Sequence, residues 1–315
     1  MDGHDDQTIG TKICNILLLP VEILWLAVKI LYYICEDICR CIVPIKKKSV
    51  AGEIVLITGA GHGIGKELAV GYASLGATVV CWDINEETNN ETMNDIKKMG
   101  IDSVYAYRCD ITDREEIFRV ARKVKEEVGD VTILINNAGI VYVKSLMNQS
   151  FDEIQRGIDV NVTAHYWTLK AFLPSMIEKN HGHVVALSSL AGLIGLPYAT
   201  VYCPSKSAVN AMMEATSEEL RMLSNGKSSV KFTTVCCYFV RTGIVKNLII
   251  RFPLIMGELL PRNAASSIID AQRRNYKIKS VPSVWLSLLK IVRHLPDKAL
   301  ECVIDFVGLR VDPED

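Results

Sequence analysis

A short apolar strand, followed at once by a glycine-rich turn and a helix, constrains the fold of this chain more than any other stretch. Residues 53–58 (Glu-Ile-Val-Leu-Ile-Thr) are apolar and β-branched, which is typical of a strand buried in a parallel sheet. Residues 59–65 read Gly-Ala-Gly-His-Gly-Ile-Gly, and residues 66–75 have a helical pattern. Glycines let the backbone approach a pyrophosphate, which the free N–H groups of the helix N-terminus then bind. The pattern predicts a dinucleotide-binding turn; a merely flexible loop is the alternative.

An acidic residue stands where such a turn needs one. A second predicted strand, residues 77–82, ends in Asp83, which lies 24 residues after Gly59. This spacing is close to that of an acid that binds the adenosine ribose hydroxyls, and a carboxylate there repels a 2′-phosphate. The glycine turn carries no Arg or Lys to hold such a phosphate, so NAD is favoured over NADP. The alternative is a strand-end acid that caps the following helix.

Strand and helix patterns alternate along the rest of the chain. Further strands are predicted at residues 103–109, 131–135, 183–187 and 278–281, and helices at residues 117–128, 151–179 and 263–274. This alternation predicts an α/β fold, a Rossmann-type doubly wound parallel sheet of about seven strands flanked by helices. Residues 51–315 are expected to form a single domain of this kind.

The first 50 residues differ from the rest and predict a membrane-association segment with a basic linker. Residues 13–35 are mostly aliphatic and as a helix would extend roughly 34 Å, enough for a bilayer core of about 30 Å. Glu22 and Lys29 lie on one helical stripe and oppose insertion, so a span, a hairpin and a helix lying in the interface stay open. The acidic leading flank argues against a cleaved signal peptide. By the positive-inside tendency, the basic run 46–48 predicts that the part of the chain after it faces the cytosol.

Tyr202 and Lys206 are the candidate proton-transfer pair. They are four residues apart, so on a helix both side chains project from one face. An ammonium beside a phenol favours phenolate, which predicts a lowered pKa for Tyr202 and proton exchange with an alcohol or ketone oxygen. Ser189 lies 13 residues earlier, after a strand, where a loop could place its hydroxyl beside the phenol. A surface tyrosine packed on a lysine stem and a strand-end serine are the alternatives.

The composition excludes several classes of protein. The chain has 35 Lys+Arg against 36 Asp+Glu, and this net charge of −1 gives no sign of nucleic-acid binding. Ten cysteines without a regular framework fit a reducing compartment better than a disulfide scaffold. Neither Cys nor His residues have zinc spacing, so no metal site is expected.

Several motifs together carry a resemblance. They are Thr58-Gly59-x-x-x-Gly63-Ile64-Gly65, Asn136-Asn137-Ala138-Gly139, Ser189 and Tyr202-x-x-x-Lys206. In order and spacing they resemble the short-chain dehydrogenases/reductases over roughly residues 51–245. Residues 50–61, 82–85 and 128–131 are similar to the membrane- and lipid-droplet-associated branch that contains 17-beta-hydroxysteroid dehydrogenases and epidermal retinol dehydrogenases.

The resemblance implies a role for each matched residue in proton transfer. Tyr202 would be the general acid/base, and Lys206 would lower its pKa and bind the nicotinamide ribose. Ser189 would hydrogen-bond the substrate oxygen. Asn161, near the middle of the predicted helix 151–179, would hold a water that joins Lys206 to a proton relay; a satisfied structural amide is the alternative.

The resemblance also implies a cofactor site. Asp83 would bind the adenosine ribose, Asp110 and Ile111 the adenine, and Thr242 the nicotinamide carboxamide, while Asn137 would line the cleft. The residues of the glycine turn implied in cofactor binding are Gly59, Gly63, Ile64 and Gly65. One departure is Cys237, which stands where the family usually has a proline that shapes the loop beside the nicotinamide.

The expected function follows from these assignments. We expect a membrane-associated oxidoreductase that transfers hydride between NAD(H) and a lipophilic alcohol, ketone or aldehyde of the retinoid or hydroxysteroid class. The apolar residues 248–256 lie where the resemblance places the substrate loop, and residues 284–306 could lie on a membrane or cover the sheet edge. An endoplasmic reticulum membrane or lipid-droplet location and a homodimer are expected. The alternatives are a non-catalytic surface-binding protein at the same membranes and an NADP-dependent carbonyl reductase.

Overall fold

The chain divides into two units. The computed structural model describes residues 4–43, 45–245, 247–308 and 310–313. Residues 1–47 form one unit and residues 48–315 the other. Each unit is described by itself below.

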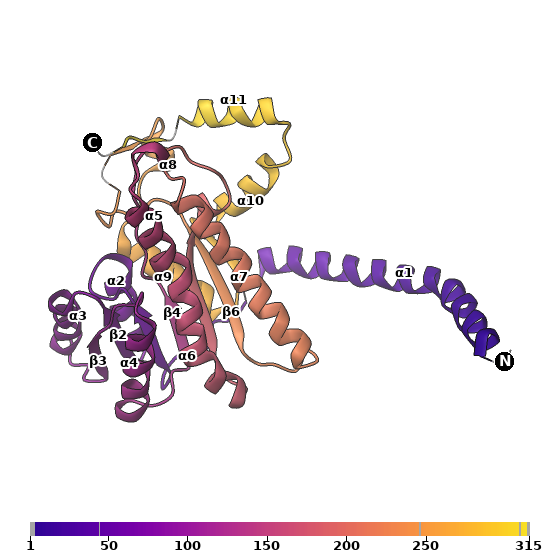
Figure 1. The fold of residues 1–315 in the computed structure, drawn as a ribbon, viewed down its shortest axis with the longest axis horizontal. Coiled ribbons are helices and arrows are strands. Elements are labelled where there is room, and N and C mark those ends of the chain that lie inside the picture. The colour runs from indigo at the N-terminus through magenta and orange to yellow at the C-terminus, as the bar shows by residue number, and fades with distance from the viewer. Residues whose placement is uncertain (1–3, 44, 246, 309, 314–315) are drawn as a thin grey trace. The chain divides into compact units, whose positions relative to one another are not determined.

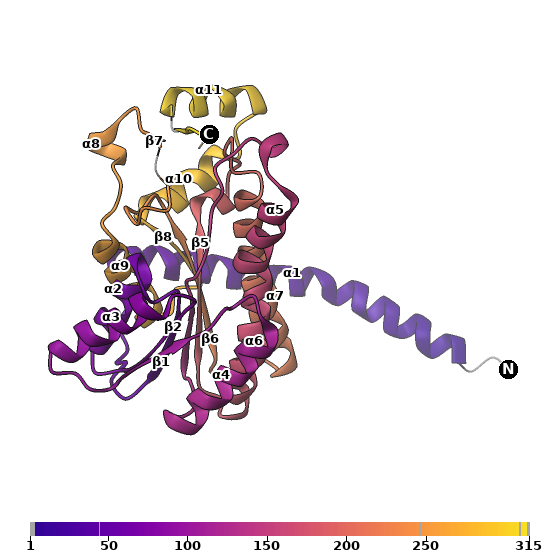
Figure 2. The ribbon, with the colours of Figure 1, turned by 60° about the vertical axis from the view of Figure 1, so that its left-hand side comes forward.

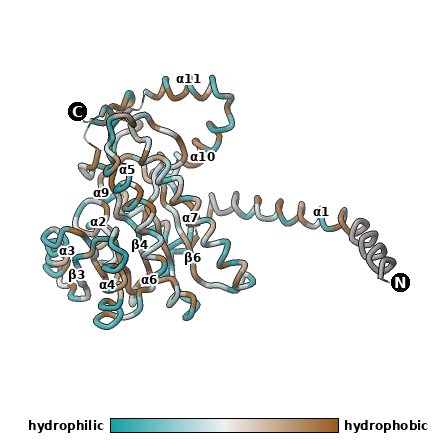
Figure 3. Tube along the Cα trace, in the orientation of Figure 1, coloured by the Kyte–Doolittle hydropathy of each residue, from teal (hydrophilic) through white to brown (hydrophobic). Residues whose placement is uncertain are grey.

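The N-terminal unit is a single long helix, α1 (His4–Ile42). Within it, Leu18–Glu36 is long and apolar enough to cross a membrane, and Figure 3 shows hydrophobic residues recurring along this part. Its large apolar side chains are exposed, Trp25 to 60% and Leu24 to 66%. Apolar surface of this extent in contact with water is unfavourable, so α1 requires an apolar environment to cover it.

The second unit is built on a seven-stranded parallel sheet, which confirms the predicted fold. Its strands are β1 (Ile54–Thr58), β2 (Thr78–Asp83), β3 (Val104–Arg108), β4 (Ile133–Asn136), β5 (His183–Ser189), β6 (Lys231–Cys237) and β8 (Ile278–Val281), in the order β3-β2-β1-β4-β5-β6-β8. The order reverses between β1 and β4. In open α/β sheets, ligands bind outside the carboxyl ends of the strands at such a switch point.

Helices cover both faces of the sheet (Figures 1 and 2). One face packs against α2 (Gly63–Ala73), α3 (Glu86–Lys98) and α9 (Pro261–Arg273). The other packs against α4 (Arg114–Glu127), α6 (Ala164–Glu178) and α7 (Tyr202–Leu223). Because both faces are covered, the central strands are continuously apolar, with Leu56, Ile57 and Leu134 fully buried.

The helix expected over residues 151–179 is interrupted. It consists of α5 (Phe151–Ile158), a π-helical segment η2 (Asp159–Thr163) and α6. A π-helical turn inserts one residue and shifts the helical phase by a single position, which a short stretch of sequence does not distinguish from an uninterrupted helix. The inserted residue changes the direction of the side chains on either side, and the segment contains Asn161.

The C-terminal part builds a cap beyond the carboxyl ends of the strands. It contains β7 (Leu248–Ile249), α8 (Pro253–Met256), α10 (Val284–Val292), α11 (Asp297–Val307) and β9 (Arg310–Val311). The strands β7 and β9 pair antiparallel as a small separate sheet. Figure 1 shows α10 and α11 in yellow above the carboxyl ends of the main sheet.

Candidate active site

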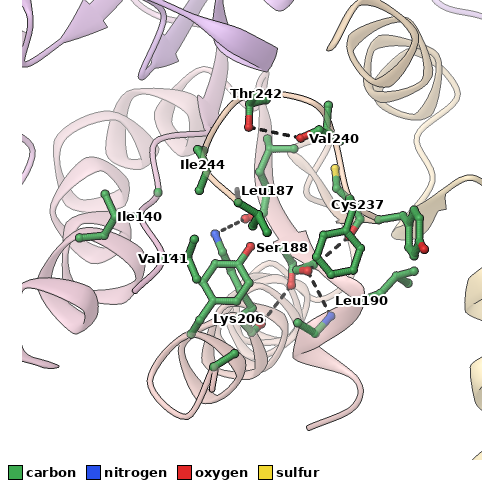
Figure 4. Close-up of a pocket in the computed structure, with 18 of the residues that line it drawn as sticks. Ile140, Val141, Leu187, Ser188, Leu190, Lys206, Cys237, Val240, Thr242 and Ile244 are labelled. Carbon is green, nitrogen blue, oxygen red and sulfur yellow. Dashed lines mark hydrogen bonds between the residues drawn. The ribbon is translucent and has the colours of Figure 1, made fainter. Parts of the chain in front are cut away.

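One cavity of about 440 Å³ lies at the carboxyl ends of the strands. Its lining begins at the glycine turn with Gly59, passes Ser189 and Tyr202, and ends at apolar side chains of the cap such as Leu289 and Val307. Figure 4 shows part of this lining. The residues predicted to bind a dinucleotide and those predicted to transfer a proton therefore share one space.

The glycine turn has the tight backbone that its sequence predicts. Gly59 has φ +68°, which L side chains rarely adopt, and a β-carbon on Gly65 would lie 1.9 Å from the carbonyl oxygen of Gly59. Asn137 stabilises this turn by donating from Nδ2 to the carbonyl oxygens of Thr58 at 2.8 Å and Gly59 at 3.1 Å. Thr58 in turn accepts hydrogen bonds at Oγ1 from the N–H groups of Asn137 and Ala138. The turn is held from the neighbouring strand end and leaves no room for a β-carbon at Gly65.

Asp83 lies at the end of β2 with its carboxylate in the cavity lining. It accepts hydrogen bonds from the backbone N–H of Gly61 at 2.8 Å and of Asn85 at 2.9 Å. The N-cap of α3 is Asn85, whose side chain accepts from the N–H of Thr88. Asp83 is therefore not the cap of that helix. It is 7% exposed and holds the glycine turn against the end of β2.

The other predicted cofactor residues also line the cavity: Ile64, Asp110, Ile111 and Thr242. Asp110 accepts hydrogen bonds from the N–H and hydroxyl of Thr112, and Arg156 lies 3.5 Å away. Burial raises the pKa of Asp110, but these hydrogen bonds and the Arg156 charge outweigh it, so the pKa is below its usual value. Thr242 packs against the glycine turn, where a β-carbon on Gly63 would lie 3.1 Å from its Cγ2.

Tyr202, Lys206 and Ser189 come together at the middle of the cavity. The Nζ atom of Lys206 lies 5.7 Å from the ring centroid of Tyr202 and donates to the carbonyl oxygen of Leu187 at 2.9 Å (Figure 4). Ser189 donates from Oγ to the carbonyl oxygen of Cys237 at 3.3 Å and accepts from the N–H of Ala191 at 3.1 Å. The side chains of Lys206 and Ser189 are thus oriented by backbone groups at the ends of β5 and β6, and the Ser189 hydroxyl bonds to that of Tyr202.

The pKa of Tyr202 moves opposite to the direction that the sequence predicts. Burial raises it to about 12, while the nearby Ser189 hydroxyl lowers it only in part. Burial also lowers the pKa of Lys206 to about 8. The ammonium lies over the phenol ring and bonds to a carbonyl, and desolvation of the phenolate outweighs its attraction. The expectation of a lowered tyrosine pKa is therefore wrong for the protein's own groups.

Asn161 binds the backbone next to the predicted Asn-Asn-Ala-Gly motif. Its Oδ1 accepts from the N–H of Ile140 at 2.9 Å, and its Nδ2 donates to the carbonyl oxygen of the same residue at 2.8 Å and to Ser205 Oγ at 3.2 Å. A β-carbon on Gly139 would lie 3.2 Å from Asn161 Oδ1 and 3.3 Å from Lys206 Nζ. Glycine thus leaves a polar space between the amide and the ammonium that is suited to a water.

Cys237 ends β6 in the position usually held by proline. It is buried, and burial raises the pKa of its thiol to about 12, so the sulfur is protonated and unreactive. Its carbonyl oxygen accepts the hydrogen bond from Ser189. A proline would supply the same carbonyl, so the departure leaves this contact of the serine intact.

Some residues of the site were not identified from the sequence. Ser188 donates from Oγ to the carbonyl oxygen of Lys206 at 3.0 Å (Figure 4), and Tyr238 stacks on Trp285 with ring centroids 5.6 Å apart. Ser188 could have been identified from its place directly before Ser189. Successive strand residues point to opposite faces, so two neighbouring serines at a strand end are expected to bond to different partners. Trp285 lies in a C-terminal segment whose apolar pattern does not reveal which helix face borders the cavity.

The site residues fit a dinucleotide. The turn at Gly65 is a cradle that a β-carbon would fill, and a carboxylate and a phenol–ammonium pair lie in the same cavity. Residues 53–250 match the family model described as short chain dehydrogenase. This chain belongs to the short-chain dehydrogenase family. The match confirms the resemblance carried by the motifs, and members of this family are oxidoreductases that act on CH–OH groups with a nicotinamide cofactor.

Relatives of known name agree with this assignment. The chain is 47% identical to bovine (Bos taurus) short-chain dehydrogenase/reductase family 16C member 6 over 77% of this chain and 76% of the relative. It is 42% identical to human 17-beta-hydroxysteroid dehydrogenase 13, over 90% and 92% of the two chains. It is 41% identical to mouse epidermal retinol dehydrogenase 2, over 89% and 90%.

Solved short-chain dehydrogenase structures share the fold. One from Burkholderia phymatum, in complex with NAD, superposes with a TM-score of 0.70 at 24% identity and covers 85% of this chain and 98% of its own. A metagenomic short-chain oxidoreductase in complex with NADP superposes with a TM-score of 0.61 at 28% identity and covers 74% and 97%. Dehydrogenases of this fold thus bind either nicotinamide dinucleotide.

Proposed function

We propose that this protein is an NAD(H)-dependent dehydrogenase of lipophilic alcohols of the retinoid or hydroxysteroid class. The observation that carries the proposal is the single cavity that joins Asp83 and the glycine turn, at one end, to Ser189, Tyr202 and Lys206, and then to an apolar wall. Relatives named for retinol and for hydroxysteroids support the substrate class.

Four polar side chains of the site take part in proton transfer. Ser189 holds the substrate oxygen, and Tyr202 takes the alcohol proton during oxidation or gives one during reduction. Lys206 supplies a positive charge beside the phenol, and Asn161 holds the water next to that charge. A nicotinamide cofactor held in this cavity would supply the hydride chemistry at the carbinol carbon. Burial raises the pKa of Tyr202 to about 12, so the phenol carries a proton at neutral pH before substrate and cofactor bind.

The choice of NAD over NADP follows from charge. The carboxylate of Asp83 lies where the second strand ends, and the glycine turn offers His62 rather than an Arg or Lys. A 2′-phosphate would meet the negative charge of Asp83 without a cation of the turn to balance it. Gly59, Gly63, Ile64 and Gly65 would carry the pyrophosphate, and Asn137 and Thr242 would border the nicotinamide half.

The apolar wall supports a lipophilic substrate. Among the cavity-lining residues of the cap are Trp285, Leu289, Val303 and Val307, none of which offers a charge. A sterol or polyene gains binding energy from such a wall, whereas a sugar or a carboxylic acid would lose its hydration there. The polar groups that could fix the reacting oxygen, Ser189 and Tyr202, lie between this wall and the glycine turn.

A membrane location is proposed for the whole chain, with residues 1–50 as the anchor and residues 51–315 as the cytosolic catalytic domain. The candidate span in α1 supports the anchor, and the basic run 46–48 supports cytosolic placement. On the cap, Ile291 is 67% exposed and lies between the basic residues Lys290 and Arg293 in the sequence, and Phe306 is 62% exposed. These features fit the endoplasmic reticulum membrane or a lipid droplet. A glycan on Asn90, part of an Asn-Glu-Thr sequence, would contradict the cytosolic placement.

A substrate screen tests the function. Full-length protein in detergent micelles is mixed with NAD⁺ or NADP⁺ and a panel of retinol and hydroxysteroids, and formation of reduced cofactor is followed by absorbance. We expect turnover with NAD⁺ on at least one member of the panel and a lower kcat/KM with NADP⁺. Binding of NADH without turnover of any member would favour the non-catalytic alternative, and a preference for NADP⁺ would contradict the role given to Asp83.

A further inference from the structure

Two stacked aromatic rings form part of the apolar wall of the cavity. Tyr238 directly follows β6, and its ring stacks on that of Trp285 in the first turn of α10, with the ring centroids 5.6 Å apart and the planes at 14°. Phe239 meets the ring of Tyr238 edge-on, with the centroids 5.1 Å apart. Both Tyr238 and Trp285 line the cavity. Such aromatic pairs bury a large area and hold a defined geometry.

Tyr238 is fixed by three neighbours, of which Trp285 is one. Its N–H donates to the carbonyl oxygen of Val281 at 2.9 Å, at the end of the adjacent strand β8. Its hydroxyl donates to the carbonyl oxygen of Met256, the last residue of α8, at 2.9 Å. The residue is 8% exposed. The backbone is thus held by the sheet and the hydroxyl by the cap, so the ring cannot turn aside without breaking a buried hydrogen bond.

The position of Trp285 is set at the start of α10. Ser280, a buried residue of β8, accepts at Oγ from the N–H of Leu286 at 2.8 Å and donates to the carbonyl oxygen of Ser283 at 2.9 Å. These bonds attach the first turn of α10 to the carboxyl end of the sheet. Among the residues of α10, all of which the structure describes, none is buried. The position of this helix therefore depends on the Ser280 bonds and on the aromatic stack.

The stack begins one residue away from a contact of the reacting site. Ser189 donates to the carbonyl oxygen of Cys237, and Tyr238 follows Cys237 in the chain. The hydroxyl that would hold the substrate oxygen and the ring that starts the aromatic wall are therefore attached to one short segment of backbone. A substrate held at its oxygen by Ser189 thus meets a wall whose place is already fixed. A rigid ligand loses little conformational entropy on binding, but it requires a preformed site of this kind.

We propose that Trp285 is the specificity-determining residue for the lipophilic part of the substrate, and that Tyr238 positions it. The fixed stack selects alcohols built on a rigid ring or polyene framework over alcohols with a flexible saturated chain. A rigid framework gains full contact with an aromatic wall, whereas a flexible chain adapts to any apolar wall and loses rotational freedom at each bond. The inference rests on the proposed function, which places the reacting oxygen at Ser189.

The test compares Trp285→Leu with Trp285→Phe, which keeps an aromatic face. Trp167→Leu is the matched control, because Trp167 is a half-buried residue of α6 that is not among the residues lining the cavity. Dissociation constants of estradiol, all-trans-retinol and 1-dodecanol are measured from the thermal stabilisation of the full-length protein saturated with NADH. Since NADH cannot accept a hydride, binding is observed without turnover. Partitioning of the alcohols into detergent is the same for every variant and cancels when variants are compared.

The expected result is a change in selectivity. Relative to 1-dodecanol, Trp285→Leu should weaken whichever of estradiol and retinol binds the parent more tightly by at least about tenfold, equivalent to about 1.4 kcal/mol. Trp285→Phe should recover part of this ratio, and Trp167→Leu should leave it unchanged. The proposal is overturned by an unchanged ratio in Trp285→Leu, by an equal loss in Trp285→Phe, or by a parent that binds neither rigid alcohol more tightly than 1-dodecanol.

A second variant keeps the test decisive if Trp285→Leu does not fold. Tyr238→Phe keeps the aromatic ring and removes the hydroxyl that bonds the carbonyl of Met256. It should shift the ratio in the same direction by about threefold, because the wall is then less firmly positioned, and an unchanged ratio would contradict the role of Tyr238. Selective binding without turnover of any alcohol would count against the proposed function and leave this inference standing, whereas turnover with an unchanged ratio would do the reverse.

Discussion

The substitution Gly65→Ala tests the dinucleotide turn most sharply. The new β-carbon would lie 1.9 Å from the carbonyl oxygen of Gly59, whereas real β-carbon contacts essentially never fall below 3.0 Å. The first turn of α2 and the end of β1 must therefore separate by roughly 1 Å. Backbone shifts that relieve overpacking cost about 1–3 kcal/mol. If this cost destabilises the backbone conformation that binds NADH, the affinity for NADH drops by about 5- to 150-fold.

The assay is NADH binding to the full-length protein, followed by fluorescence, with thermal unfolding measured on the same samples. Gly195→Ala is the matched control, because a β-carbon there meets nothing within 4 Å. We expect the control to bind NADH as the parent does and Gly65→Ala to bind far more weakly. Equal affinity in the two variants would refute the assignment of residues 59–65 to the pyrophosphate.

Three other predictions follow from the same site. Asp83→Ala should weaken NAD⁺ binding about 10- to 100-fold and reduce the ratio between the dissociation constants of NADP⁺ and NAD⁺. If binding measurements gave the same ratio as in the parent, the role of the carboxylate would be contradicted. Thr58→Val should lower the free energy of unfolding by about 1–3 kcal/mol, because it leaves the N–H groups of Asn137 and Ala138 without their acceptor; denaturant unfolding measures this, and a neutral result would show that both groups find water. Lys206 is protonated below its pKa of about 8 and neutral above it, so NADH affinity should fall as the pH rises through that value, and a flat profile from pH 7 to 9 would contradict the need for its charge.

The sequence predicted the sheet because its signals are local. Buried parallel strands are short apolar runs, and the strand at residues 278–281 was predicted at its observed bounds. The glycine turn and Asp83 were identified for a similar reason, since each follows directly from the end of a strand. Such features depend on neighbours within a few residues, which a single sequence contains.

The features that the sequence did not predict depend on contacts between distant segments. The raised pKa of Tyr202 results from burial by strands and loops far from α7 in the chain. The small sheet of β7 and β9 joins Leu248 to Val311 through strands of two residues, which carry no recognisable pattern. His165 is buried, and among the described residues neither of its ring nitrogens has a hydrogen-bond partner, which the sequence alone does not show because it does not say what surrounds the side chain.

The most direct test of the central claim is one comparison between the parent and Tyr202→Phe. The claim is that a phenol and an ammonium, one helical turn apart, carry the proton of a nicotinamide-dependent hydride transfer. NADH binding and product formation are measured on the same preparations of full-length protein, with the best substrate of the panel. We predict that Tyr202→Phe binds NADH within about twofold of the parent and loses at least about 100-fold in kcat. A phenylalanine variant that turns over as fast as the parent would contradict the account.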